Sequence, residues 1–169
     1  VTLALDVPTP GMERPRWTAP EVEIVHLADP PPLDGTLTGF PADATVHLDH
    51  DDQYRRSEEP YEGAEAFSAH AWLGWDERCV YVAVHVSKDA PIFRAPDAPP
   101  LRLDNEPDLI HTDSLQIYIT PDGEPMSGWL VAPDPRSDGL TVLPVSGTGA
   151  RPDQLQGRWQ RADDGYIVT

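Results

Sequence analysis

Twenty prolines and twelve glycines interrupt this chain of 169 residues, and they limit the length of every regular element that it can form. Proline lacks the backbone N–H that helices and sheet ladders use, and both residue types favour turns. The best helical candidate, residues 58–67, itself contains a proline and a glycine. Long helices are therefore not expected, and the sequence predicts short strands joined by turns.

Three segments alternate apolar and polar side chains with the two-residue period of a β-strand: residues 67–75, 80–86 and 114–119. The first two are joined at Asp76, Glu77 and Arg78, which predicts a hairpin. Their apolar faces, Leu73 and Trp75 among them, are expected to build one core. With residues 21–28 and later segments there are about eight short strands, which indicates an all-β fold, an antiparallel β-sandwich or jelly roll.

The strand pattern occupies residues 21–169, and residues 1–20 form a proline-rich lead-in with four prolines. One domain of this size buries roughly 70% of the surface that its unfolded chain exposes. The last four residues, 166–169, are β-formers with nothing after them. We therefore expect a sandwich that is incomplete at its C-terminal end.

The charge balance excludes two classes of partner. Acidic residues outnumber basic ones by 29 to 12, for a formal net charge of −17. Such a field repels nucleic acid and anionic membrane surfaces. No apolar run of about 18 residues is present to span a membrane, and the single cysteine, Cys79, allows no internal disulfide. Calcium, cationic partners and neutral ligands remain open.

The faces opposite the predicted core gather aromatic rings and hydrogen-bonding groups. Such a mixture suits a sugar, because rings stack on its apolar face and polar groups meet its hydroxyls. The alternative is an ordinary half-solvated outer face of an antiparallel sheet. The side chains concerned are His70, Trp72, Tyr81, His85, Gln116 and Tyr118.

Five short motifs follow one another between residues 20 and 169. They are Leu33-Asp34-Gly35, Trp75-Asp76, Val80-Tyr81-Val82 with Asp89 after it, residues 113–119 (DSLQIYI) and Gly165-Tyr166-Ile167-Val168. In order and spacing they resemble family 9 carbohydrate-binding modules. The resemblance implies a non-catalytic β-sandwich with structural calcium, attached to a secreted glycan-degrading enzyme.

The chain departs from that family where the sugar is held. Members that clamp a sugar ring do so between two tryptophans, and the first of these positions is Ile110 here, while the second lies beyond the end of this chain. A glutamate of the family motif is Gln116. If a glycan binds, another ring must stack on it, and the candidates are Trp72, Tyr118 and Trp129.

A loop rich in oxygen ligands precedes the third alternating segment. Residues 103–113 offer carboxylates in a proline-bent loop, which suits a hard cation such as calcium. The alternative is a capped loop in which Asp113 accepts backbone N–H bonds. The predicted structural calcium ligands are Asp104, Glu106, Asp108 and Asp113.

A second polar cluster is the segment HLDHDD, residues 47–52. On a strand, His47, Asp49 and Asp51 would point to one side. Imidazole with carboxylate suits zinc or another transition metal. The competing interpretation is a solvated acidic edge, because runs of charge are usually solvated.

The sequence therefore predicts a non-catalytic carbohydrate-binding-like module that recognises a glycan through one sheet face, outside the cytoplasm, beside other domains of its polypeptide. Two alternatives stay open: an enzyme that uses His111 with Asp113, or His70 with His85, as acid and base, and a structural accessory domain of a larger enzyme. A haem held by Met12 or Met126 with Lys88 or His85 is a further, weaker alternative.

Overall fold

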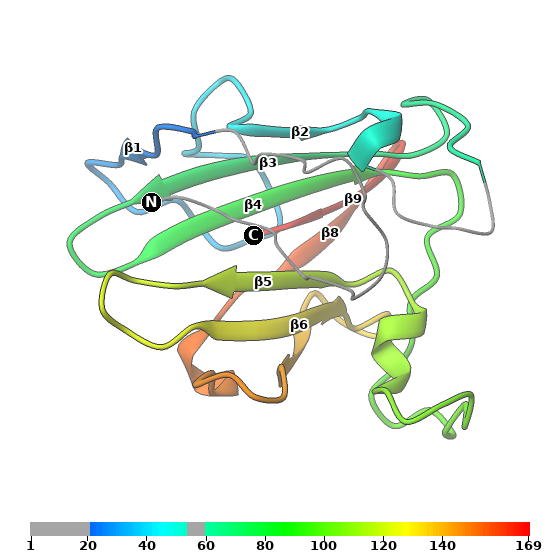
Figure 1. Cartoon of the computed structure of the whole chain (residues 1–169). Helices are drawn as coiled ribbons and strands as arrows, with labels where there is room; N and C mark the ends of the chain where they lie inside the picture. The colour runs from blue at the N-terminus through cyan, green and yellow to red at the C-terminus, as the bar shows by residue number, and fades with distance from the viewer. Residues whose placement is uncertain (1–20, 54–59) are drawn as a thin grey trace.

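The computed structural model describes residues 21–53 and 60–169, and this part of the chain is built from strands and short 3₁₀ turns (Figure 1). The predicted lead-in, residues 1–20, lies outside the described residues. The strands are β1 (Val25–His26), β2 (Val46–Leu48), β3 (Ser68–Trp75), β4 (Val80–Ser87), β5 (Leu115–Ile119), β6 (Ser127–Pro133), β7 (Leu140–Pro144), β8 (Trp159–Ala162) and β9 (Gly165–Val168), and the 3₁₀ turns are η1 (Asp51–Gln53), η2 (Asp108–His111) and η3 (Pro152–Gln154).

Two sheets face each other, so the predicted all-β sandwich is confirmed. The larger sheet has six strands in the order β1-β3-β4-β9-β8, with β2 also paired to β3. The smaller sheet has the order β5-β6-β7. All strand pairs are antiparallel except β1 with β3. Figure 1 shows the two layers, with β3 and β4 above β5 and β6.

The β3–β4 hairpin is the longest strand pairing in the described part of the chain and confirms the hairpin prediction. Ser68 pairs with Ser87 at one end and Trp75 with Val80 at the other. Asp76 makes the turn, because its Oδ1 accepts hydrogen bonds from the backbone N–H groups of Arg78 and Cys79, at 2.7 and 2.8 Å. Short polar side chains that bond the backbone two residues on are typical of such turns.

The core lies between the sheets and continues onto β8 and β9. Its main cluster consists of Ala69, Val86, Trp159, Tyr166 and Val168, with Phe93 and Leu115 packed against it. A second cluster lies on the outer face of the smaller sheet, where Leu109 of η2 packs against Leu130 and Ala132. Both clusters follow from the alternation of side chains along each strand.

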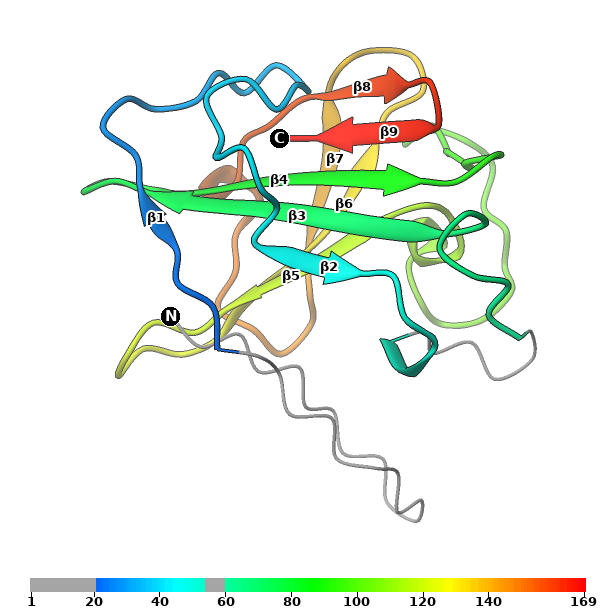
Figure 2. The same cartoon turned by 90° about the horizontal axis from the view of Figure 1, so that it is seen from above.

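The segment between β1 and β2 covers part of the outer face of the larger sheet. Figure 2 shows it running from β1 across to β8 and back to β2. Leu27 fills the space beside Gly74, where a Cβ atom would overlap it. Gly35 donates its N–H to Thr169 Oγ1 at 2.8 Å, and the side chain of Gln160 donates to the carbonyl of Asp34 at 2.6 Å. This coverage decides which side chains of the sheet meet solvent.

Candidate functional site

The predicted sugar-binding side chains of the larger sheet do share one face. His70 lies directly opposite His85, and Trp72 lies opposite Ala83, next to Tyr81 along β4. Trp72 and Tyr81 are buried, however, at 8% and 9% exposure. Their rings therefore belong to the packed layer and offer no platform to a ligand.

The remaining predicted side chains lie elsewhere, so the prediction of one shared face is wrong. Gln116 and Tyr118 point away from the cleft between the sheets, on the outer face of the smaller sheet, where the Tyr118 hydroxyl donates to Gln116 Oε1 at 2.8 Å. Trp129 points between the sheets and is buried. Alternation sorts the two faces of each strand, but it does not say which sheet a strand joins.

Tyr81 has a structural role in the hairpin turn. Its hydroxyl donates to Asp76 Oδ2 at 2.8 Å, and this bond is the main reason that the pKa of Tyr81 rises to about 12. The N–H of Arg78 and then the Tyr81 hydroxyl hold the pKa of Asp76 below its usual value. The ionised carboxylate is therefore the form that the folded turn prefers.

Asp76→Asn is expected to lower the melting temperature at neutral pH. A carboxyl group whose pKa is lower in the folded state stabilises that state at any pH above its pKa in the unfolded chain, which is about 3.9 for aspartate. This stabilisation is lost as the pH falls through the pKa of the folded state. The difference in melting temperature between wild type and variant should therefore disappear below about pH 4. Melting followed by circular dichroism from neutral to acid pH checks this, with Asp122→Asn in the exposed β5–β6 turn as control. A gap that stays constant with pH would contradict the assignment.

The four carboxylates predicted to hold calcium do not converge. Asp113 accepts two hydrogen bonds from Lys88 Nζ, Asp108 pairs with Arg94, and Asp104 pairs with His111. They do not form a cluster with Glu106 that could hold an ion, among the residues that the structure describes. The structure does not bring this ligand set together, because Lys88 and Arg94 from outside the loop and His111 from within it each pair with one of the carboxylates.

Ion pairs also engage the histidines of the two acid–base alternatives, although His70 and His85 remain opposite each other on β3 and β4. His111 Nε2 lies 3.1 Å from Asp104 Oδ2, while Asp113 is bound to Lys88, so His111 and Asp113 do not form an acid–base pair. His85 Nε2 lies 2.9 Å from Asp164 Oδ1. Lys88 and His85 are thus both occupied by carboxylates, and Met12 lies outside the described residues.

One aromatic side chain that the sequence assigned to the core is exposed. Trp75, the last residue of β3, is 43% exposed, whereas Trp72, Trp129 and Trp159 are buried. Trp17 lies outside the described residues. Alternation placed Trp75 with the core. The last residue of a strand before a turn can extend past the opposite sheet, however. The place of Trp75 directly before the turn at Asp76 is therefore the sequence signal that could have predicted its exposure.

Polar groups surround this exposed indole. Trp75 Nε1 donates to the carbonyl of Ile24 at 3.1 Å, which fixes the plane of the ring. The His26 ring stands nearly perpendicular to it, with 4.7 Å between centroids. Glu77 Oε1 lies 3.2 Å from His26 Nε2, and its own backbone N–H and then His26 lower the pKa of Glu77. The arrangement combines an apolar ring with an imidazole and an ionised carboxylate.

A cleft of about 480 Å³ lies between the two sheets. Val82 and Val84 of β4 line it from one side, and Ile117 of β5 and Val131 of β6 line it from the other. Val80, the register partner of Trp75, also lines it and is itself half exposed. The exposed indole therefore lies next to the rim of this cleft.

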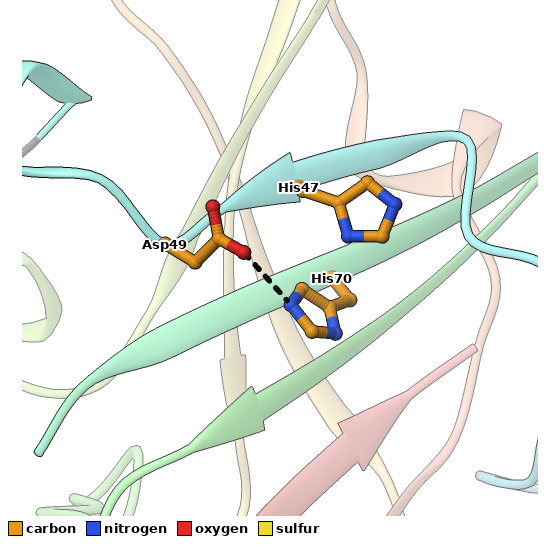
Figure 3. A group of neighbouring side chains, drawn as sticks. All are labelled: His47, Asp49 and His70. Carbon is orange, nitrogen blue, oxygen red and sulfur yellow. Dashed lines mark ion pairs between the residues drawn. The ribbon is translucent and has the colours of Figure 1, made fainter. Parts of the chain in front are cut away.

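The polar segment at residues 47–52 also finds a partner from another strand. His47 and Asp49 lie beside His70 of β3 (Figure 3). This is the single group of three or more possible metal ligands in the described ranges, 21–53 and 60–169.

No helix among the described residues is long and apolar enough to cross a membrane. A scan against protein-family models finds no match, and searches of the curated proteins and of the solved structures find none either. What the chain binds must therefore be argued from its own surface.

Proposed function

We propose that this chain is a non-catalytic carbohydrate-binding module in which Trp75 is the sugar-stacking residue. The observation that carries the proposal is the exposed, fixed indole: it is 43% exposed and is held by a hydrogen bond to the backbone of Ile24. A ring that is already immobile loses little conformational entropy when a ligand stacks on it. An aromatic face with polar neighbours also matches the two kinds of surface that a sugar ring presents.

The groups beside the ring supply the polar half of the site. His26 stands nearly perpendicular to the indole, Glu77 pairs with His26, and both side chains are exposed. Imidazole nitrogen and carboxylate oxygen can bond sugar hydroxyls as donor and acceptor. The chain carries a net charge of −17, which repels acidic polysaccharides. The proposed ligand is therefore a neutral polysaccharide, and such a module would work outside the cell beside a neighbouring domain.

Trp75→Ala is expected to weaken the binding of a neutral polysaccharide by roughly thirtyfold, since a hot-spot tryptophan contributes about 2 kcal/mol. Affinity gel electrophoresis against soluble plant and microbial glycans finds the ligand, and calorimetry measures the affinity. Trp75→Phe, which keeps a ring, should retain part of the affinity.

Leu103→Ala is the matched control, because Leu103 is 67% exposed and lies in the loop before η2. It should bind as wild type does. Equal affinity in wild type and Trp75→Ala, or no retardation by any neutral glycan, would refute the proposal.

A further inference from the structure

The register of β2 on β3 places two imidazoles side by side on the outer face of the larger sheet. His47 lies directly opposite His70, and their ring centroids are 4.8 Å apart. Asp49 follows His47 by two residues and returns to the same side, as Figure 3 shows. His70 Nε2 and Asp49 Oδ2 are 3.8 Å apart, and one ligand atom from each of the three residues lies within 4.8 Å of the others.

The loop that carries Asp49 is held by a single side chain. Gln53 Oε1 accepts hydrogen bonds from the backbone N–H groups of Asp49 and His50, both at 2.9 Å. Gln53 Nε2 donates to the carbonyl of His47 at 2.8 Å. Three bonds from one residue thus fix the backbone on both sides of the carboxylate, so the cluster is organised before any ligand arrives.

Two polar atoms of the cluster are enclosed and have no hydrogen-bond partner: Asp49 Oδ1 and His70 Nε2. Buried polar atoms are nearly always paired, and each exception calls for an explanation. The pairs His85–Asp164 and His111–Asp104 close to 2.9 and 3.1 Å, respectively. The distance of 3.8 Å between His70 and Asp49 leaves a gap between an imidazole nitrogen and a carboxylate oxygen.

We propose that His47, Asp49 and His70 bind a first-row divalent transition metal ion, with Zn²⁺ as the best match. Two imidazole nitrogens and one carboxylate oxygen form a donor set that suits zinc and is too poor in oxygen for calcium. A tetrahedral ion with bonds of about 2.0–2.1 Å holds its ligand atoms about 3.3 Å apart. The ligand atoms lie farther apart than this, 3.8 Å between His70 and Asp49 and within 4.8 Å across the set, so the side chains have to rotate inward to close on the ion. His47 is exposed, so the ion can reach the site from solvent.

The ion would bridge the edge strand β2 to β3, because His47 and His70 come from these two strands. β2 has only three residues, so its own ladder holds it weakly. The metal site is separate from the proposed sugar site: Trp75 lies five residues along β3 on the other face, which is about 16 Å away. The two proposals can therefore succeed or fail independently.

Titration of the metal-free chain with Zn²⁺ tests the proposal. One ion should bind per chain and raise the melting temperature, in the presence of a millimolar excess of Ca²⁺. Co²⁺ in its place should give the visible absorption of a tetrahedral site with nitrogen ligands. His47→Gln, His70→Gln and Asp49→Asn should each weaken Zn²⁺ binding by at least the roughly 10–100-fold that loss of even a supporting group costs.

Two comparisons keep the result unambiguous. His26→Gln, at the sugar site, should leave Zn²⁺ binding unchanged, and His70→Gln should leave glycan binding unchanged. Because His47 is exposed, His47→Gln should have the same melting temperature as wild type in EDTA. The rise in melting temperature that Zn²⁺ gives the wild type should be absent in this variant. No Zn²⁺-dependent rise in the wild type, displacement by Ca²⁺, or equal binding by His47→Gln and wild type would overturn the proposal.

Discussion

Gly35→Ala is expected to reduce the free energy of unfolding by about 2–4 kcal/mol, the sum of a backbone cost and an overlap cost. Gly35 has φ of +80°, a conformation that L side chains rarely adopt. A Cβ atom there would lie 2.6 Å from the carbonyl carbon of Trp159 and 2.7 Å from the nitrogen of Gln160. Both are backbone atoms, which cannot turn aside as a flexible side chain can. Urea unfolding followed by tryptophan fluorescence measures the loss.

Gly123→Ala separates the two costs. Gly123 has nearly the same backbone angle, φ of +77°, but nothing lies within 4 Å of the position of its Cβ. It should lose only about 1 kcal/mol, the cost of placing a non-glycine residue in that conformation. If both variants lose the same amount, the close approach of the 27–45 segment to β8 contributes nothing to stability.

Lys88→Met is expected to cost about 2–3 kcal/mol of stability, somewhat below the value of about 3–5 for a fully buried pair, because the lysine is partly exposed. Lys88 Nζ donates to both carboxylate oxygens of Asp113, at 2.9 and 3.0 Å. The Asp113 side chain is only 9% exposed, while that of Lys88 is 33% exposed. Without the lysine, the buried carboxylate keeps the backbone N–H of Ile92 as its one hydrogen-bond donor among the described residues. Urea unfolding measures the loss.

A double variant shows whether the charge is the cause. Lys88→Met combined with Asp113→Asn removes the unpaired carboxylate, so it should recover part of the stability that Lys88→Met alone loses. Arg151→Met, which breaks an exposed pair with Asp153, should unfold almost as the wild type does. No recovery in the double variant would contradict the assignment of the loss to the unpaired carboxylate.

The local strand assignments followed from the sequence where the two-residue period was long. The pattern at 67–75 and 80–86 became β3 and β4, and 114–119 became β5, within one residue at each end. The strand expected at 21–28 is reduced to β1, two residues parallel to β3. A short alternating segment becomes a strand only where another strand lies beside it with unpaired backbone N–H and C=O groups. The arrangement of the whole sheet decides where such a strand is present.

The candidate sites depended on contacts between segments distant in the chain. The sequence identified the polar segment at His47 and Asp49, but the register of β2 on β3 brought His70 beside them. Likewise, alternation put Trp75 with the core, and its exposure depends on where the opposing sheet ends.

The sequence by itself determined an all-β chain, the β3–β4 hairpin and a strongly acidic net charge, because periodicity, turn residues and net charge are local or summed properties. The tertiary structure alone decided which strands share a sheet, which rings are covered and which charges neutralise one another. Those outcomes depend on the register of the strands and on the paths of the loops. A two-residue alternation is compatible with many registers and with many loop paths.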